Sequence, residues 1–165
     1  MSNQADDPLE PTAGEVLIRR ATAEDMPRVV REWLNSFRGS RWSGPVPNNL
    51  YKKVYGEGIR QLLDRGAVVD VACWKEQPSL LLGFICSEHT PRDRILHYCF
   101  VRSAYRQEGI AKALQLGAGI VPPFVYTYRT DDASYICHGQ RHLKELACRR
   151  DAYKADPEAP AGAMN

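Results

Sequence analysis

The sequence lacks two features that would assign it to a specialised class of protein. It has no apolar run near the roughly 18 residues that a membrane-spanning helix needs. It also has no dominant charge, because 22 basic residues nearly balance 20 acidic ones and leave a net charge of +2. Dedicated nucleic-acid-binding domains usually carry a large basic excess. We therefore expect a soluble globular protein with no membrane partner, and we do not favour nucleic acid as a partner.

A closed set of disulfides is missing too, since the chain has five cysteines and an odd number cannot all pair. Cys73, Cys86 and Cys99 lie in apolar stretches, where a free cysteine behaves as a small buried hydrophobic residue. Residues 1–15 have neither the basic nor the apolar region of a signal peptide. These observations favour reduced thiols and a cytoplasmic location.

A structural metal site is not indicated, although Cys137, His138, His142 and Cys148 lie close together in the sequence. Four-ligand zinc sites usually contain paired cysteines two to four residues apart, and this group has no such pair. We therefore predict that the protein binds no metal.

The sequence contains alternating strand and helix patterns, and its length is that of a single domain. We expect a disordered tail over residues 1–14, a single domain over residues 15–155 and a frayed tail over residues 156–165, because both ends are rich in proline, glycine or alanine. No internal repeat is present.

Within the domain, apolar periodicity predicts the order of elements. The expected strands are 15–20, 67–74, 80–88, 94–101, 124–128 and 152–155. The first expected helix follows an N-cap at Thr22. The other expected helices are 50–65, 107–116 and 140–149. Gly66 should end the second helix. This order predicts an α/β layered domain with a mixed sheet and helices on both faces.

The strongest local feature is the segment 101–111, which follows a strand and begins a helix. The first amides of a helix have no partner within it, and its dipole is positive there, so this end of a helix binds phosphate. Gly109 removes a side chain where a pyrophosphate must approach the backbone, and Ala111 is small for the same reason. Arg106 can add a charge-assisted contact. The alternative is a helix that simply begins at a glycine.

The segment resembles the pyrophosphate motif of the GNAT acetyltransferases, and the resemblance covers roughly residues 15–128. The residues that stand in register with the motif are Val101, Tyr105, Arg106, Gly109 and Ile110, with Ala111 as the common small alternative. The preceding order of one strand, two helices and three strands is also that of this superfamily. The chain departs from the motif at Ser103, Ala104, Gln107 and Glu108, and a carboxylate at 108 disfavours phosphate unless it turns to solvent.

The resemblance implies that acetyl-CoA is a co-substrate and that strands 96–101 and 124–128 splay apart around its pantetheine arm. A backbone amide near Phe100 or Val101 would then polarise the thioester carbonyl. The residues implied in coenzyme binding are Phe100, Val101, Tyr105, Arg106, Gln107, Gly109, Ile110 and Ala111.

An amine acceptor must lose a proton before it attacks a thioester, and a base with a pKa near 7 suits this step. A catalytic histidine of the arylalkylamine branch stands at the position of His97, which makes His97 the leading base, acting directly or through a water. The alternative is a structural histidine with both nitrogens hydrogen-bonded. Simple alternation places His97 on one face of the strand with Ile95, Cys99 and Val101. Glu88 is a second candidate base, although we favour a solvated strand end there.

GNAT enzymes often protonate the leaving thiolate with a tyrosine. Tyr135 is nearest to the expected place, with Tyr126 and Tyr128 as alternatives. The superfamily usually has an asparagine a few residues earlier, and this chain has none there. The alternative is that Tyr135 packs under the last helix.

The loop between the first two helices walls the acceptor site in GNAT folds. Here it offers Arg38, Arg41 and Trp42, which could hold an anionic acceptor or stack on a base. The alternative is a surface loop anchored by Trp42.

The leading hypothesis is transfer of an acetyl group from acetyl-CoA to a primary amine. The chain is also similar to GNAT-like proteins of bacteriophages, which would allow a modified nucleobase or a host protein as acceptor. Glu108 and the missing asparagine favour a different alternative, a GNAT-like binding or regulatory protein without activity. We leave open whether the protein is a monomer or a homodimer.

Overall fold

The computed structural model describes residues 15–40, 45–127 and 141–142. Its strands form one sheet in the order β1-β2-β3-β4-β5-β6. Their bounds are Val16–Arg20, Val68–Trp74, Leu81–His89, Arg94–Val101, Val125–Tyr126 and Arg141–His142. Neighbours among the first four strands are antiparallel, and β5 pairs in parallel with both β4 and β6. The sheet is therefore mixed and mostly antiparallel, which confirms the predicted fold class.

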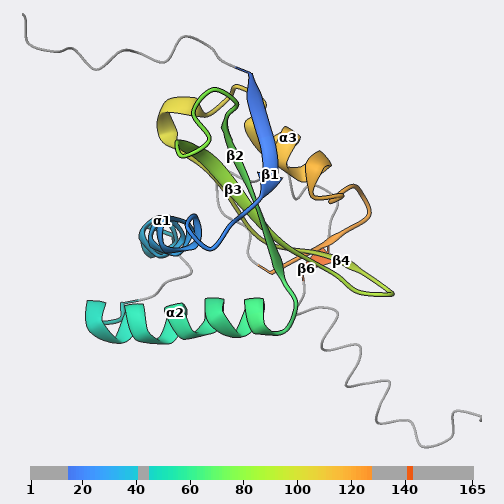
Figure 1. Ribbon diagram of the computed structural model, residues 1–165. Coiled ribbons are helices and arrows are strands. Elements are labelled where there is room, and N and C mark those ends of the chain that lie inside the picture. The colour runs from blue at the N-terminus through green and yellow to red at the C-terminus, as the bar shows by residue number, and fades with distance from the viewer. Residues whose placement is uncertain (1–14, 41–44, 128–140, 143–165) are drawn as a thin grey trace, which may run out of the picture.

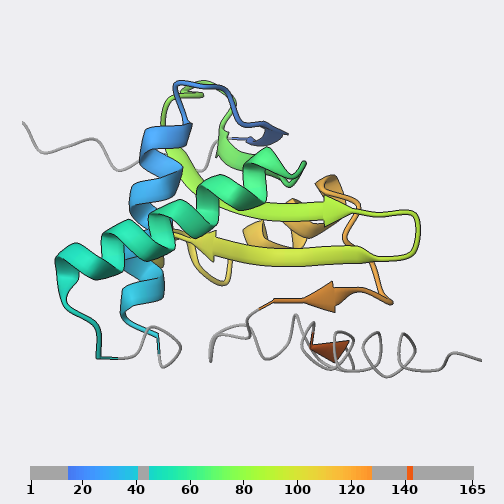
Figure 2. The same cartoon turned by 90° about the horizontal axis from the view of Figure 1, so that it is seen from below.

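The helices lie on both faces of this sheet, as predicted (Figures 1 and 2). Helices α1 (Met26–Arg38) and α2 (Asn48–Asp64) cover one face, and α3 (Ile110–Gly117) covers the other. A short 3-10 helix, η1 (Ser103–Tyr105), connects β4 to the loop before α3. None of the described helices is long and apolar enough to cross a membrane.

Each face of the sheet has its own hydrophobic core. Under α1 and α2, Val29, Trp33 and Phe37 are buried against the sheet, and Trp33 stacks on Tyr98 at 5.1 Å between ring centroids. Under α3, Leu114 and its neighbours pack on a separate buried cluster. Full burial of one such side chain contributes about 1.5–3 kcal/mol, so the two cores hold β4 firmly from both sides.

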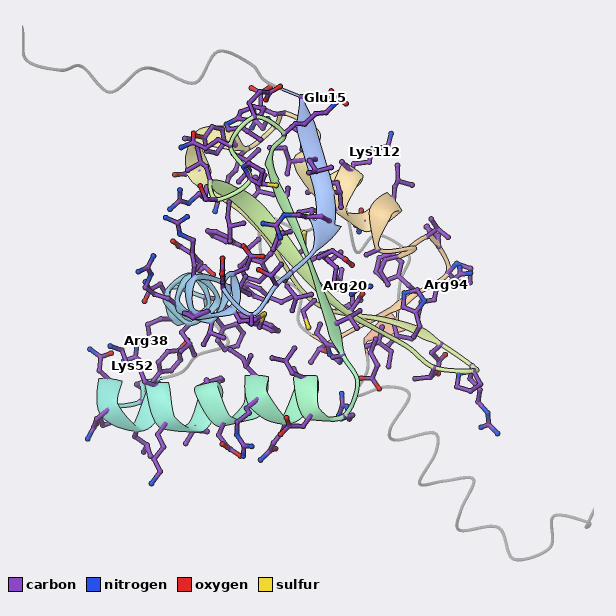
Figure 3. The ribbon with its side chains drawn as sticks, viewed as in Figure 1. Glu15, Arg20, Arg38, Lys52, Arg94 and Lys112 are labelled. Atoms are coloured by element: carbon purple, nitrogen blue, oxygen red, sulfur yellow. The ribbon has the colours of Figure 1, made fainter. Side chains whose placement is uncertain are left out.

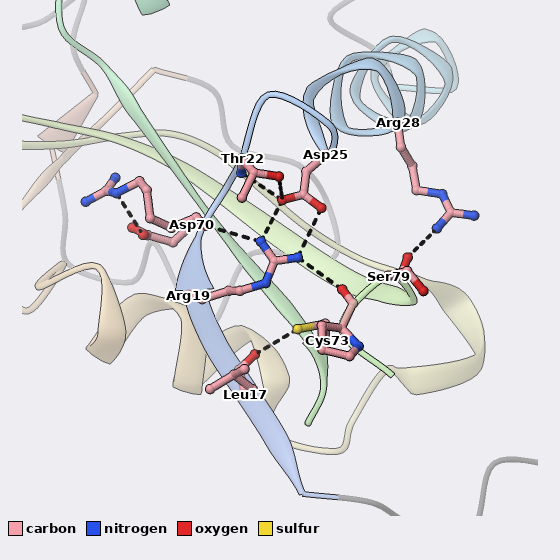
Figure 4. Close-up of polar contacts among 10 residues, drawn as sticks. Leu17, Arg19, Thr22, Asp25, Arg28, Asp70, Cys73 and Ser79 are labelled. Carbon is pink, nitrogen blue, oxygen red and sulfur yellow. Dashed lines mark hydrogen bonds and ion pairs between the residues drawn. The ribbon is translucent and has the colours of Figure 1, made fainter. Parts of the chain in front are cut away.

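The turn into α1 differs from the sequence prediction, because Asp25 rather than Thr22 is the N-cap. The Asp25 carboxylate accepts hydrogen bonds from Arg19 at 2.6 and 3.1 Å and from the amide and hydroxyl of Thr22 at 2.8 and 3.0 Å (Figure 4). These bonds hold residues 22–25 in a turn and delay the helix to Met26. Hydrogen bonding by Arg19 lowers the pKa of Asp25 to about 2 despite its burial.

The end of α2 agrees with the prediction. Gly66 has a φ of +107°, the left-handed conformation that glycine adopts without strain. The Gly66 amide donates to the Leu63 carbonyl and the Ala67 amide to the Leu62 carbonyl, both at 3.0 Å. This is the double hydrogen bond of a glycine-terminated helix. It leads the chain directly into β2.

The C-terminal prediction was wrong where the structure describes it. Residues Arg141 and His142 form β6 and pair with Val125 and Tyr126, whereas the sequence pattern predicted a helix from 140 to 149. The outer edge of β5 offers unpaired amides and carbonyls, so pairing with a distant segment overrides a weak local pattern. The strand predicted at 152–155 and both predicted tails lie outside the described residues.

Candidate functional site

A β-bulge in β4 organises the centre of the candidate site. Cys86 of β3 pairs with Tyr98, but the next residue, Ser87, pairs with Leu96, so His97 is an extra residue in β4. A bulge shifts the alternation of side chains by one. As a result Leu96 joins Cys99 in the cluster under α3, while Tyr98 packs under α1. The predicted alternation, with His97 on the face of Cys99, was therefore wrong.

The bulge also marks the limit of pairing between β4 and β5. Ile95 and Leu96 pair with Val125 and Tyr126, and the Thr127 amide donates to the Leu96 carbonyl at 3.0 Å. Among the described residues the ladder stops here, although β4 continues to Val101. Residues 98–101 of β4 therefore extend past the described part of their parallel neighbour.

His97 is only 1% exposed, and both of its ring nitrogens have partners. Nε2 lies 3.0 Å from Oε2 of Glu88, and Nδ1 lies 2.8 Å from Oγ1 of Thr127. An ionised carboxylate can only accept, so Nε2 donates to Glu88. Burial lowers the pKa of His97, and the opposing effect of Glu88 does not cancel this. The neutral ring then carries its one proton on Nε2, and Nδ1 accepts from the Thr127 hydroxyl.

Glu88 is not the solvated strand end that we favoured from the sequence. Its side chain is 15% exposed and accepts hydrogen bonds from His97 and from Nη2 and Nε of Arg65, at 2.9 and 3.1 Å. Burial raises the pKa of Glu88, but the hydrogen bonds from His97 and Arg65 outweigh this effect and keep the pKa below its usual value. The result is an ionised carboxylate between a cation and a neutral imidazole.

Two members of this group were not predicted from the sequence. Arg65 follows α2 and Thr127 follows β5, so they lie far apart in the chain. No local pattern marks either residue, because only the packing of α2 and the pairing of β5 bring them to His97.

The loop between η1 and α3 has the backbone geometry of an anion site. Gln107 and Gly109 have φ values of +67° and +77°, and Gly109 is the N-cap of α3. Among the described residues, no backbone carbonyl accepts from the amides of residues 107–112. A Cβ built on Gly109 would have no neighbour within 4 Å, so the space beside it is open. A backbone in which right-handed and left-handed residues alternate directs successive amides toward one side, where they can hold an anion.

The two ends of this loop are anchored in the protein. The Tyr105 ring lies edge-on to Trp74 at 6.0 Å, and Ile110 is 3% exposed under α3. Nε of Arg106 donates to the Val101 carbonyl at 3.1 Å. The side chains of Tyr105 and Ile110 therefore pack inward and fix the loop, while Arg106 and Gln107 are exposed. Glu108 is exposed.

The backbone amides of β4 point alternately toward β3 and away from it, and the hydrogen bonds show which amide points which way. The Arg102 amide donates to the Leu82 carbonyl at 2.9 Å, so it points toward β3. Amides alternate along an antiparallel strand, and the Phe100 amide therefore also points toward β3, while the Val101 amide points away from it. Of the two residues predicted to polarise a thioester, Val101 has the suitable orientation.

Gly83 allows the close approach of β3 to this part of β4. A Cβ at Gly83 would lie 2.5 Å from the Phe100 carbonyl oxygen and 3.2 Å from Cα of Val101. Contacts below 3.0 Å are not tolerated by a backbone atom that cannot rotate away. Glycine at 83 therefore fixes the position of the β4 segment that carries the Val101 amide.

Arg38 is the described member of the predicted acceptor group. It lies at the end of α1, near Lys52 at the start of α2 (Figure 3). Its guanidinium is 4.7 Å from the centre of the Tyr51 ring, and Nη2 donates to the Val46 carbonyl. These contacts tie the α1–α2 connection together. Arg41, Trp42 and the predicted acid Tyr135 lie outside the described residues.

Metal ligands are not gathered in the described part of the chain, where no three histidine, cysteine or acidic residues form a cluster able to hold an ion. Of the group weighed from the sequence, His142 lies in β6, and Cys137, His138 and Cys148 lie outside the described residues.

Comparison with known proteins finds similarity in structure. No protein-family model and no curated protein sequence matches the chain. A Pyrococcus furiosus protein assigned as an acetyl transferase superposes with a TM-score of 0.57 at 18% identity, over 92% of this chain and 98% of that one. Apo-form YjaB from Escherichia coli superposes with a TM-score of 0.53 at 17% identity, over 75% of this chain and 80% of that one.

A third similar structure, the PaiA N-acetyltransferase from Thermoplasma acidophilum in complex with coenzyme A, has a TM-score of 0.49 at 19% identity, over 64% of this chain and 70% of that one. At these identities the likeness to the Pyrococcus furiosus protein and to YjaB establishes the fold. The protein has the GNAT fold, a mixed and mostly antiparallel sheet with helices on both faces.

Proposed function

We propose that the protein is an N-acetyltransferase that moves an acetyl group from acetyl-CoA to a primary amine. The observation that carries this proposal is the loop before α3. Its amides, from Gln107 to Lys112, have no described backbone acceptor, and the space beside Gly109 is open. A diphosphate is the part of CoA that such a row of amides binds.

The rest of β4 supplies a reason for acyl transfer rather than simple binding. A coenzyme whose diphosphate lies on the loop can extend its pantetheine arm along residues 98–101, beyond the described pairing with β5. The Val101 amide, which points away from β3, is then suited to donate to the thioester oxygen. The base is the buried group around His97, and we assign the role of acid to Tyr135.

The acceptor side is less specific. We propose that it lies on the α1–α2 face of the sheet, where His97 and Tyr98 both project after the bulge. Arg38, Arg41 and Trp42 remain the proposed acceptor residues, with Arg38 acting also as a brace for Tyr51. Acceptors worth testing include polyamines, arylalkylamines, aminoglycosides, peptides and modified nucleobases, the last because of the resemblance to bacteriophage proteins.

The first test separates coenzyme binding from its absence. Acetyl-CoA and S-acetylpantetheine, which lacks the diphosphate, are compared by thermal shift at equal concentration. A ligand bound only by the native state stabilises it by about 2.7 kcal/mol at 100 times its Kd. We expect a clear rise in Tm with acetyl-CoA and little or none with S-acetylpantetheine. Equal shifts, or no shift with acetyl-CoA, would contradict the role of the loop.

The second test separates an enzyme from a binding or regulatory protein. Wild-type protein is incubated with acetyl-CoA and the panel of amines above, and free CoA thiol is detected. Release of thiol that depends on an amine supports the transferase. A protein that is stabilised by acetyl-CoA but releases no thiol with any amine is the regulatory alternative, for which Glu108 in the loop is the supporting residue.

A further inference from the structure

The leading candidate base, His97, is sealed from solvent. It is 1% exposed, and its two nitrogens are occupied by Glu88 and Thr127. An acceptor amine cannot reach a nitrogen that is buried and already hydrogen-bonded. Thr127 differs, because its side chain is only partly buried while its hydroxyl lies 2.8 Å from Nδ1. The end of the group that Arg65 does not bond is therefore the hydroxyl of a partly buried residue.

We propose that Thr127 is the residue that contacts the acceptor nitrogen and that it passes the amine proton to His97, with Glu88 as the positioning residue behind the ring. This inference rests on the proposed function. It follows from the order Thr127, His97, Glu88, in which each polar atom lies 3.0 Å or less from the next. The arrangement matches the general pattern of a reactive hydroxyl, a base and a group that orients the base.

The step balances without any further reactant. The bound acceptor is an ammonium, and one of its N–H protons moves to Oγ1 of Thr127 as the hydroxyl proton moves to Nδ1 of His97. The lone pair freed on nitrogen forms the bond to the acetyl carbon, and the C–S bond breaks with its electron pair on the CoA sulfur. The nitrogen then loses its second proton, which reaches the thiolate through the acid assigned above and gives the neutral amide and the CoA thiol. The imidazolium afterwards returns its proton to solvent through Thr127.

The charges around the ring suit a transient imidazolium. Glu88 from β3 faces Nε2 as an ionised carboxylate, and Arg65, after α2, donates to the same carboxylate oxygen. Cys86, also on β3, stays neutral because burial raises the pKa of its thiol to about 12. Hence the resting ring is neutral and able to accept a proton, and Glu88 is a close counter-ion for the charge formed on acceptance.

The kinetic test uses Thr127→Val and Thr127→Ser, with acetyl-CoA as donor and two probe acceptors, 2-phenylethylamine and aniline. General base catalysis typically contributes about 10²–10⁴-fold. We expect Thr127→Val to lower kcat with 2-phenylethylamine by about 10²-fold or more at pH 7. The deficit should shrink about tenfold per pH unit above that, because the free amine fraction grows by the same factor. Aniline is already unprotonated at pH 7 and should show little deficit.

Thr127→Ser keeps the hydroxyl and should retain most of the activity at every pH. Thr90→Val is the matched control, since Thr90 also uses its hydroxyl for local hydrogen bonds but lies in the β3–β4 turn. It should leave both the rate and its pH dependence unchanged. A pH-independent loss in Thr127→Val, or equal losses with both amines, would indicate a merely structural role and overturn the relay.

A second measurement does not depend on turnover. Nitrogen chemical shifts of His97 in the wild type at pH 7 report which ring nitrogen carries the proton. The relay requires Nε2–H and an accepting Nδ1, and the opposite tautomer would overturn it. Mass spectrometry after incubation with acetyl-CoA gives a further check, because a stable acetyl group on Thr127 would show that the hydroxyl is a nucleophile rather than a relay.

The failure of the relay and of the proposed function are distinguishable. Wild-type protein that acetylates no amine overturns both, whereas a wild type that is active alongside an equally active Thr127→Val overturns the relay alone.

Discussion

Two glycines with a left-handed backbone, in different surroundings, test whether the loop before α3 binds the coenzyme diphosphate. Gly109 begins α3 at φ +77°, and Gly66 ends α2 at φ +107°. A Cβ on either glycine would meet nothing within 4 Å, so alanine at these positions causes no clash. Any loss of stability therefore comes from the left-handed backbone. Only Gly109 lies in the row of amides proposed to bind the diphosphate.

The expected magnitude follows from two opposing effects. The left-handed conformation costs an alanine about 1–2 kcal/mol. Alanine also restricts the unfolded chain, which offsets about 0.4–1 kcal/mol of that cost. Gly109→Ala and Gly66→Ala should therefore each lower the free energy of unfolding by about 1 kcal/mol. Gly58→Ala, in the interior of α2 with no Cβ neighbour, should instead raise it by about 0.5–1 kcal/mol.

The two variants should separate in coenzyme affinity. A residue that relaxes away from positive φ turns the following amides, and one hydrogen bond to a charged group contributes about 1.5–3 kcal/mol. Loss of one such bond weakens the acetyl-CoA Kd by about 10- to 100-fold, since about 1.4 kcal/mol is tenfold. We expect this for Gly109→Ala and an unchanged Kd for Gly66→Ala, measured by calorimetric titration beside denaturant unfolding. Equal affinities in the two variants would refute the assignment of the diphosphate to this loop.

Two further predictions concern the framework that holds the site. Gly83→Ala places a Cβ 2.5 Å from a carbonyl oxygen of β4. We therefore expect the free energy of unfolding, measured in urea, to fall by about 1–3 kcal/mol, and kcat to fall as well. Unchanged stability would show that the two strands can separate without cost. Asp25→Asn removes a carboxylate whose pKa is lowered to about 2, and such a group stabilises the fold above its unfolded pKa of 3.8 and ceases to do so as the pH falls through 2. Because Arg19 is one quarter exposed and solvent screens the pair, the variant should lose about 1–2 kcal/mol at pH 7 and progressively less below pH 4, and a deficit that persists at pH 2 would contradict the ionic explanation.

The loop before α3 could be predicted from the sequence because the determinants of its backbone are local. A glycine that follows a strand and precedes an apolar helix fixes both the turn and the free amides, and Gly109 has the left-handed backbone that this requires. Ile110 was also predicted as a coenzyme-binding residue; its side chain lies in the core, so only its amide is left to contact the diphosphate in the proposed row. A motif shows which residues a family conserves in a segment, and it does not separate those that bind from those that hold the segment in place.

The group around His97 could not be predicted, because its members meet through non-local pairing. Alternation along a strand assumes one residue per position in the ladder, and the sequence of β4 carries no signal for the extra residue at 97. Glu88 looked like the end of a strand facing solvent. It is instead partly buried and bonded to Arg65, which is more than 20 positions away in the chain.

The bulge and the polar partners of His97 depend on each other. Without the extra residue, alternation would turn the imidazole toward the cluster under α3, where Leu82, Ile85 and Leu114 are fully buried and apolar. A buried polar group without a partner costs about 1–3 kcal/mol, and an imidazole has two nitrogens to satisfy. The bulge instead directs the ring to Glu88, and the same residue ends the β5 ladder so that Thr127 reaches Nδ1. A histidine at this position is therefore tolerated in the core only in the orientation that gives both ring nitrogens a partner, and one of these partners is the hydroxyl of a partly buried threonine.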